Sequence, residues 1–232
     1  MKKRKMDTWS FKSFFGKFLK ECISLLKYDG GDQKLVSRLK RGIKSKIFDD
    51  AKVILEPELE TSILKTMTHG DYWVNNMLFS SADPEDTGLT VTMLDFQLMS
   101  LAHPARDIWY LLYVNTDKEF RDKHLQTVLR EYFQVFSGYL QIEGVKISFD
   151  DFLKDISPIR APIAMIFSIL VLFVGLNPEP IGFNTFSEMK QFGETFKRQV
   201  GSEPRDMDDP MVKEIRRRIL GIIYELDIEG LL

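Results

Sequence analysis

Two short runs of apolar and β-branched residues interrupt a chain whose other apolar residues recur mostly at helical spacing. The runs span residues 77–79 and 89–94, and the segment 81–88 between them is rich in turn-forming residues. This pattern predicts a β-hairpin. Polar segments at residues 69–76 and 95–97 flank the hairpin. Because its strands run back alongside each other, the hairpin is predicted to present these two segments together at its base.

The rest of the chain is predicted to be mainly helical. Apolar residues repeat every three or four positions in several segments, each with a recognisable start or stop signal. The expected features are a helix over residues 11–26 ended by Gly30 and Gly31, a helix capped by Asp32, helices after Arg106 and over residues 125–140, a helix begun by Ser148 and Asp151, a weakly periodic stretch at 181–204, and a last helix opened by Asp209 and Pro210.

These elements predict a mainly α fold with a small β-hairpin, of the α+β class. At 232 residues and 44% hydrophobic composition, the chain is expected to form one main body. We divide this single domain, residues 1–232, into a helical segment (1–56), a loop-and-hairpin segment (57–108) and a helical subdomain (109–232).

Composition argues against several classes of protein. Residues 1–50 hold 14 Lys and Arg against 6 Asp and Glu, a net +8, which leaves −10 for the remainder of a chain of net charge −2. We interpret the basic start as a solvated helix face, because its aromatic residues follow helical spacing and not a base-stacking pattern. No nucleic-acid partner is therefore expected. The longest apolar stretch, residues 161–176, is too short for a comfortable bilayer span and contains Pro162, so no membrane span is expected either. The single cysteine, Cys22, fits a reducing compartment, so the expected location is cytoplasmic.

The polar segments at the base of the hairpin carry the residue types that phosphoryl transfer requires. That reaction uses a carboxylate to orient the attacking hydroxyl and accept its proton, and oxygen ligands to hold Mg²⁺ against the nucleotide phosphates. Asp71 is the candidate base, and Asn76 and Asp95 are the candidate metal ligands. Each alone is more often a turn residue or a loop amide, so the prediction depends on their spacing and order.

The motif His-Gly-Asp-x-x-x-x-Asn at residues 69–76, followed by a hydrophobic strand ending in Asp95-Phe96-Gln97, resembles the aminoglycoside and choline kinase superfamily. More narrowly, it resembles the ecdysteroid-kinase-like family, also called CHK-type kinases. The resemblance implies the C-terminal lobe of the protein-kinase-like fold. It also implies catalytic Asp71, Mg²⁺ ligands Asn76 and Asp95, a structural His69, and an Asp107 that braces the catalytic loop.

The resemblance implies an ATP-dependent phosphotransferase acting on a hydroxyl of a small molecule, a steroid-like alcohol, with ATP and Mg²⁺ as cofactors. Such kinases carry a glycine-rich loop and a strand-borne lysine in an N-terminal lobe. Neither is recognisable in residues 1–66, so the sequence is expected to be a truncated or partial protein. Such a truncation is expected to expose apolar surface and to favour self-association.

Two alternatives stay open on the sequence alone. One is a catalytically inactive kinase-like remnant with a binding or regulatory role. The other is a metal-dependent hydrolase built on His69, Asp71 and Asp95, although the chain has only three histidines. His103 and His124 lie outside the motif, so a zinc site has little support, and Gln97, Tyr72 and Trp73 receive no role.

Overall fold

The structure is a computed structural model, and it describes residues 20, 22–45, 64–81, 88–164 and 210–232. The chain divides into two compact units. The first comprises Met1–Phe48 and Ile169–Leu232, and the second comprises Asp49–Ser168. The second unit contains the hairpin and every predicted site residue. Most of the helix predicted over residues 11–26 and all of the stretch at 181–204 lie outside the described residues.

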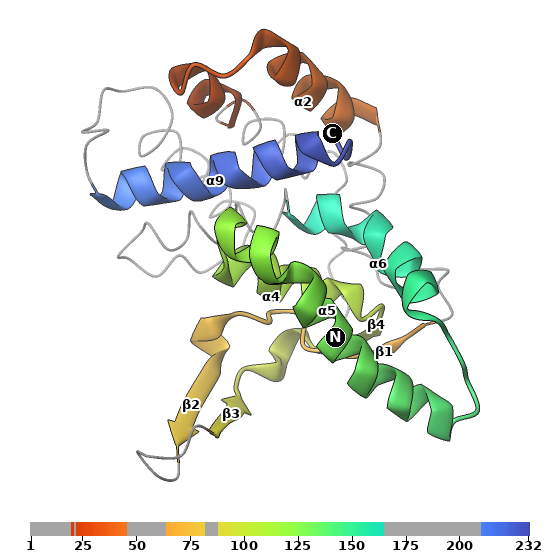
Figure 1. The fold of residues 1–232 in the computed structure, drawn as a ribbon. Helices are drawn as coiled ribbons and strands as arrows, with labels where there is room; N and C mark the ends of the chain where they lie inside the picture. The colour runs from red at the N-terminus through yellow and green to blue at the C-terminus, as the bar shows by residue number, and fades with distance from the viewer. Residues whose placement is uncertain (1–19, 21, 46–63, 82–87, 165–209) are drawn as a thin grey trace, which may run out of the picture. The chain divides into compact units, whose positions relative to one another are not determined.

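The predicted hairpin is present. Strands β2 (Met77–Ser81) and β3 (Leu89–Met93) pair antiparallel, with Met77 opposite Met93 and Phe79 opposite Val91 (Figure 1). Because side chains alternate across a strand, these two pairs share one face of the ribbon. Thr90 and Thr92 lie on the opposite face, opposite Ser80 and Leu78. The hairpin therefore has an apolar face and a more polar face.

A second two-stranded sheet was not predicted from the sequence. Strand β1 (Thr66–Thr68) pairs antiparallel with β4 (Ser100–Ala102), and the Thr68 hydroxyl donates to the Ser100 carbonyl oxygen at 3.0 Å. In the sequence, β1 precedes the hairpin and β4 follows it. Because Thr68 pairs with Ser100, the start of the polar segment 69–76 lies close to the residues that follow the polar segment 95–97.

The described part of this unit also contains three helices, α4 (Ala105–Asn115), α5 (Lys118–Ile142) and α6 (Phe149–Ile163), and α6 contacts the other two. The predicted start of α6 is confirmed, because the Ser148 hydroxyl accepts from the Asp151 amide at 3.1 Å and donates to the Asp151 carboxylate at 2.6 Å. The predicted mainly helical character and the predicted small β-hairpin are likewise confirmed for the described residues.

Helix α4 is the central element of this unit, because it is buried along most of its length. Trp109 is 2% exposed, and its indole Nε1–H donates to the Ile156 carbonyl of α6 at 2.8 Å. Just before α4, the buried His103 ring accepts from the Ala105 amide through Nδ1, and its Nε2 contacts the Asp155 carboxylate at 2.6 Å. Because one ring nitrogen accepts, the other carries the proton and donates to Asp155. α4 is thereby fixed against α6.

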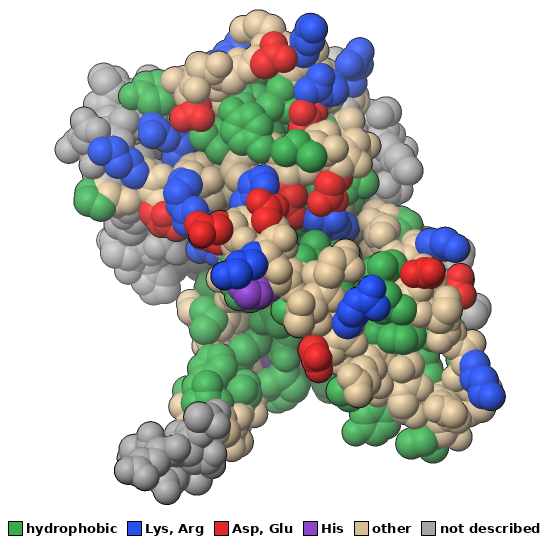
Figure 2. Space-filling view, in the orientation of Figure 1, with side chains coloured by type: hydrophobic (Ala, Val, Ile, Leu, Met, Phe, Trp, Pro, Cys, Tyr) green, Lys and Arg blue, Asp and Glu red, His purple; other side chains and the backbone are tan. Residues whose placement is uncertain are grey.

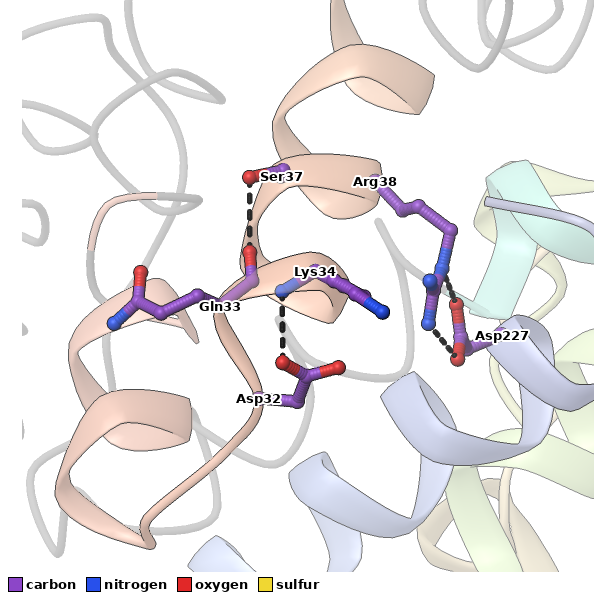
Figure 3. Close-up of polar contacts among 6 residues, drawn as sticks. All are labelled: Asp32, Gln33, Lys34, Ser37, Arg38 and Asp227. Carbon is purple, nitrogen blue, oxygen red and sulfur yellow. Dashed lines mark hydrogen bonds and ion pairs between the residues drawn. The ribbon is translucent and has the colours of Figure 1, made fainter.

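The first unit is built from α2 (Gln33–Ser45), α9 (Pro210–Ile228) and a helical stretch at residues 22–28. The predicted cap of α2 is confirmed, because the Asp32 carboxylate accepts from the Lys34 amide at 3.0 Å (Figure 3). Pro210 is the first residue of α9, as predicted, while the predicted cap Asp209 lies outside the described residues. Arg38 of α2 binds Asp227 of α9 through two hydrogen bonds of 2.5 and 2.7 Å. Among the described residues, no helix has the length and apolar character needed to cross a membrane.

Candidate active site

The Asp71 carboxylate is held from both sides. Its Oδ1 accepts a hydrogen bond of 2.7 Å from the Tyr110 hydroxyl of α4, and its Oδ2 accepts one of 3.0 Å from Asn76 Nδ2. Asp71 is half-buried, while Tyr110 is buried. Each carboxylate oxygen has a second lone pair beyond the one that these donors occupy. The carboxylate is thus oriented and retains the capacity to accept a further proton donor.

Asn76 closes the polar loop formed by residues 69–76. Its Nδ2 donates to the Asp71 carbonyl oxygen at 2.9 Å as well as to the Asp71 carboxylate. Two acceptors on the same side of the amide fix which end is nitrogen, since an oxygen there would face two other oxygens. The Asn76 amide oxygen is therefore the atom that could ligate a cation.

His69 connects the polar loop to the segment that follows β3. Its ring Nδ1 is 3.4 Å from the donating Asp71 amide, and its Nε2 is 2.8 Å from the Leu94 carbonyl oxygen. This pattern requires a proton on Nε2, which donates to Leu94. The ring also lies 4.9 Å from the Phe96 ring, centroid to centroid. Both ring nitrogens therefore have backbone partners, and the hydrolase alternative loses its histidine ligand.

Asp107 bonds to the start of the polar loop from the first turn of α4. One of its carboxylate oxygens accepts from the His69 amide at 2.6 Å, and the other accepts from the Gly70 amide at 3.0 Å. Hydrogen bonds to a carboxylate are stronger than those between neutral groups. This arrangement has the geometry expected of a brace on the loop.

Gly70 is a position that tolerates no side chain. Its φ is +83°, and a Cβ built there would lie 2.5 Å from the Leu98 carbonyl oxygen. The backbone conformation favours glycine, and the close approach of Leu98 excludes a larger residue. The loop therefore packs directly against the backbone of the segment after Asp95.

Asp95 follows β3 and is exposed. The Leu94 amide donates to the Asn76 carbonyl oxygen at 2.9 Å, so the two predicted metal ligands are brought together through adjacent backbone. Asp95 has φ 59° and ψ 65°, in the left-handed region, and its carboxylate accepts from Gln97 Nε2 at 3.1 Å. One amide donor leaves most of the carboxylate's acceptor capacity open.

The donor set suits a magnesium ion shared with a nucleotide. Mg²⁺ prefers oxygen ligands, and in kinases it is bound by one or two carboxylates or amides together with phosphate oxygens. The Asp95 carboxylate and the Asn76 amide oxygen are ligands of that kind. Among the described residues, no group of three or more His, Cys, Asp or Glu side chains could hold a metal alone. The site fits an ion whose remaining ligands come from substrate and water.

Sequence reasoning assigned no role to three residues that contact the site. Tyr110 donates to Asp71, Gln97 donates to Asp95, and the Asn115 amide oxygen accepts from the Val74 amide at 2.9 Å. Tyr110 lies three positions after Asp107 on one helix, so the two share a face. That spacing is the signal that could have identified Tyr110, since Asp107 was already expected to face the loop.

Two aromatic residues of the loop are partly buried. Burial, and then the charge of Asp107, raises the pKa of Tyr72 above its ordinary value. The Trp73 indole Nε1 is buried without a hydrogen-bond partner among the described residues. Both side chains lie beside Asp71 in the sequence, and their roles stay unassigned.

The ecdysteroid kinase-like family matches residues 1–144, which is more than half of the sequence and includes all the residues that line this site. The chain belongs to the ecdysteroid kinase-like family. The resemblance inferred from the 69–76 and 95–97 motifs is thereby confirmed. No curated protein and no solved structure matches the chain.

Membership of the ecdysteroid kinase-like family gives the chain a kinase-like phosphotransferase ancestry. ATP and Mg²⁺ are the cofactors that kinases use in general. The match ends just after α5, so α6 and α9 lie beyond it. The individual roles of Asp71, Asn76, Asp95, His69 and Asp107 are not settled by the family match and stay predictions.

Proposed function

We propose that this protein transfers the γ-phosphoryl group of ATP to a hydroxyl of a small molecule, of the steroid-like alcohol class that the family name suggests. The unit Asp49–Ser168 would be part of the C-terminal lobe of a protein-kinase-like fold. The observation that supports this proposal is the Asp71 carboxylate, held by Asn76 and Tyr110 in a loop that is hydrogen-bonded to the segment carrying Asp95.

Asp71 acts as the base in this proposal. Its free lone pairs accept a hydrogen bond from the acceptor hydroxyl, which directs an oxygen lone pair of that hydroxyl toward the γ-phosphorus. As the new P–O bond forms and the bond to the ADP oxygen breaks, the hydroxyl proton passes to the Asp71 carboxylate. Asp71 then releases the proton to solvent, which its half-buried position permits.

Asn76 and Asp95 would hold Mg²⁺, which when bound neutralises charge on the phosphates. Asn76 would serve two purposes, because its nitrogen orients Asp71 and leaves its amide oxygen available as a ligand for the cation. Its amide thus couples the position of the base to that of the metal. His69 and Asp107 act on the backbone, and they hold the polar loop in the geometry that the other three residues need.

Substitution of Asp71 by Asn tests the proposal. The amide keeps the size of the carboxylate but cannot accept a proton, so we expect kcat for ATP-dependent phosphorylation of a hydroxylated acceptor to fall about 100-fold or more. Phosphotransfer is measured with radiolabelled ATP on a panel of small alcohols that includes steroids. Asp150→Asn, an exposed position in α6, is the matched control and should keep wild-type activity. Activity that survives Asp71→Asn unchanged would refute the assignment.

The second candidate is a kinase-like protein that binds a partner or Mg²⁺ without turnover. The exposed apolar face of the hairpin favours it, because such a surface suits an interaction with another protein. This candidate predicts a folded wild-type protein that transfers no phosphate to any acceptor.

A further inference from the structure

Tyr110 combines burial with direct contact to the proposed base. It lies in the second turn of α4, is 7% exposed, and its hydroxyl is 2.7 Å from Asp71 Oδ1. A carboxylate can only accept in this pair, so the phenol donates. The distance is ordinary for an O–H···O hydrogen bond and also falls within the range of a hydroxyl bonded to an ionised carboxylate.

The Tyr110 contact complements the contact from Asn76. The asparagine donor comes from the same loop as Asp71 and moves with it, whereas the tyrosine donor comes from a helix packed against α6. A single donor would leave the carboxylate free to rotate about its last torsion angle, which is broad and roughly two-fold. Donors on both oxygens remove that freedom, and the one on α4 ties the carboxylate to the rigid part of the unit.

Tyr110 itself is held in the protonated state. Burial raises its pKa far above the ordinary value of 10.0, and the hydrogen bond to Asp71 and the negative charges of Asp71 and Asp107 raise it further. The phenol therefore keeps its proton at neutral pH and cannot replace Asp71 as the base. It is a permanent donor.

Helix α4 contacts the polar loop at two levels. Asp107 holds the backbone amides of His69 and Gly70, and Tyr110, one turn later, holds the Asp71 side chain. We propose that Tyr110 is a positioning residue that orients the Asp71 carboxylate toward the acceptor hydroxyl. The proposal rests on the proposed function, in which Asp71 is the base.

Tyr110→Phe removes only the hydroxyl and keeps the ring that fills the core. We expect kcat to fall about 10-fold, with KM for ATP unchanged, because loss of a hydrogen bond to a charged group misorients the base without altering nucleotide binding. In an Asp71→Asn background, where the base is already absent, the same substitution should have no further effect on kcat. Circular dichroism and a thermal melt establish that each variant is folded.

Tyr113→Phe is the matched control. Tyr113 lies on the same helix and is fully buried, and its hydroxyl accepts from Arg160 of α6 at 2.7 Å. We expect its kcat to equal that of the wild type. An equal fall in kcat for the two phenylalanine variants would overturn the proposal, because it would indicate general loosening of α4. An unchanged kcat in Tyr110→Phe would overturn it as well.

The Tyr110 proposal and the proposed function fail in different ways. A wild-type protein that transfers phosphate, loses transfer in Asp71→Asn and keeps it in Tyr110→Phe contradicts only the role of Tyr110. A wild type without transfer, or one whose transfer survives Asp71→Asn, contradicts the proposed function and with it any positioning role in that reaction.

Discussion

Asp95 adopts a backbone conformation that costs free energy. Among the described residues, it alone has a positive φ without being glycine. The left-handed region costs an ordinary residue about 1–2 kcal/mol, and aspartate lowers that cost through local hydrogen bonds such as the one from Gln97. Strain of this kind often accompanies a functional side chain, because selection for stability alone would favour glycine.

A comparison of Asp95→Gly with Asp95→Ala isolates the free-energy cost of the positive φ at residue 95. Both variants lose the carboxylate, so both should lose phosphotransfer. Only alanine retains the steric cost of a positive φ, so we expect Asp95→Gly to have a free energy of unfolding about 1 kcal/mol higher than Asp95→Ala, as measured by urea denaturation. Equal stabilities would mean that residue 95 is not left-handed in solution.

At the scale of elements, helix α4 acts as the support for the polar loop through Asp107. The Asp107→Asn variant keeps the size of the side chain but has one acceptor oxygen for two backbone amides, and its own NH₂ group would face the second amide. We expect the free energy of unfolding to fall by about 2–3 kcal/mol, because a charge-assisted bond is lost and a donor is left unpaired.

Asp122→Asn in α5 is the control for that measurement. Asp122 is exposed and pairs with Lys118 one turn earlier, so its loss should cost less than about 0.5 kcal/mol. Chemical denaturation of the two variants decides the matter. If Asp107→Asn lowers the free energy of unfolding no more than Asp122→Asn does, Asp107 does not stabilise the polar loop as proposed.

The sequence was sufficient to predict elements with local signals. The β2–β3 hairpin corresponds to two short apolar runs separated by turn-forming residues in the sequence, α6 begins at the predicted Ser148 cap, and α9 begins at Pro210. The β1–β4 pair could not be predicted in the same way. Its strands are three residues long, and they lie on either side of the hairpin, so no local pattern links them.

The site was predictable only in part, because some of its contacts depend on tertiary packing and not on local sequence patterns. The spacing of Asp71, Asn76 and Asp95 follows from the motif, and Asp107 follows from the resemblance. The Tyr110 contact depends on the rotation of α4 about its axis, which tertiary packing of Trp109 against α6 determines. The left-handed backbone of Asp95 likewise depends on the contacts of the adjacent segment with Asn76 and His69.

At the scale of the whole molecule, the apolar face of the hairpin is a surface in the described part of the chain that is suited to association. Phe79 and Val91 face each other across the strands and are 53% and 45% exposed, and Figure 2 shows hydrophobic side chains along this ribbon. Exposed apolar area of this kind favours burial against another surface. We therefore expect the isolated protein to self-associate.

Sedimentation velocity over a range of protein concentrations checks this expectation. The double variant Phe79→Ser/Val91→Thr should shift the distribution toward monomer. Leu78→Ser, on the opposite face of the ribbon and 57% exposed, is the control and should leave the distribution unchanged. A wild type that is monomeric at every concentration would contradict the expectation.

Calorimetric titration with ATP directly tests the proposed role of Asn76 and Asp95 as joint ligands of a magnesium ion bound to the nucleotide phosphates. We expect the wild type to bind ATP when Mg²⁺ is present and much more weakly when EDTA removes it. Asp95→Asn should lose the dependence on Mg²⁺ while it remains folded, because asparagine tolerates the left-handed backbone. Mg²⁺-dependent ATP binding that is unchanged in Asp95→Asn, or its absence from the wild type, would contradict the account.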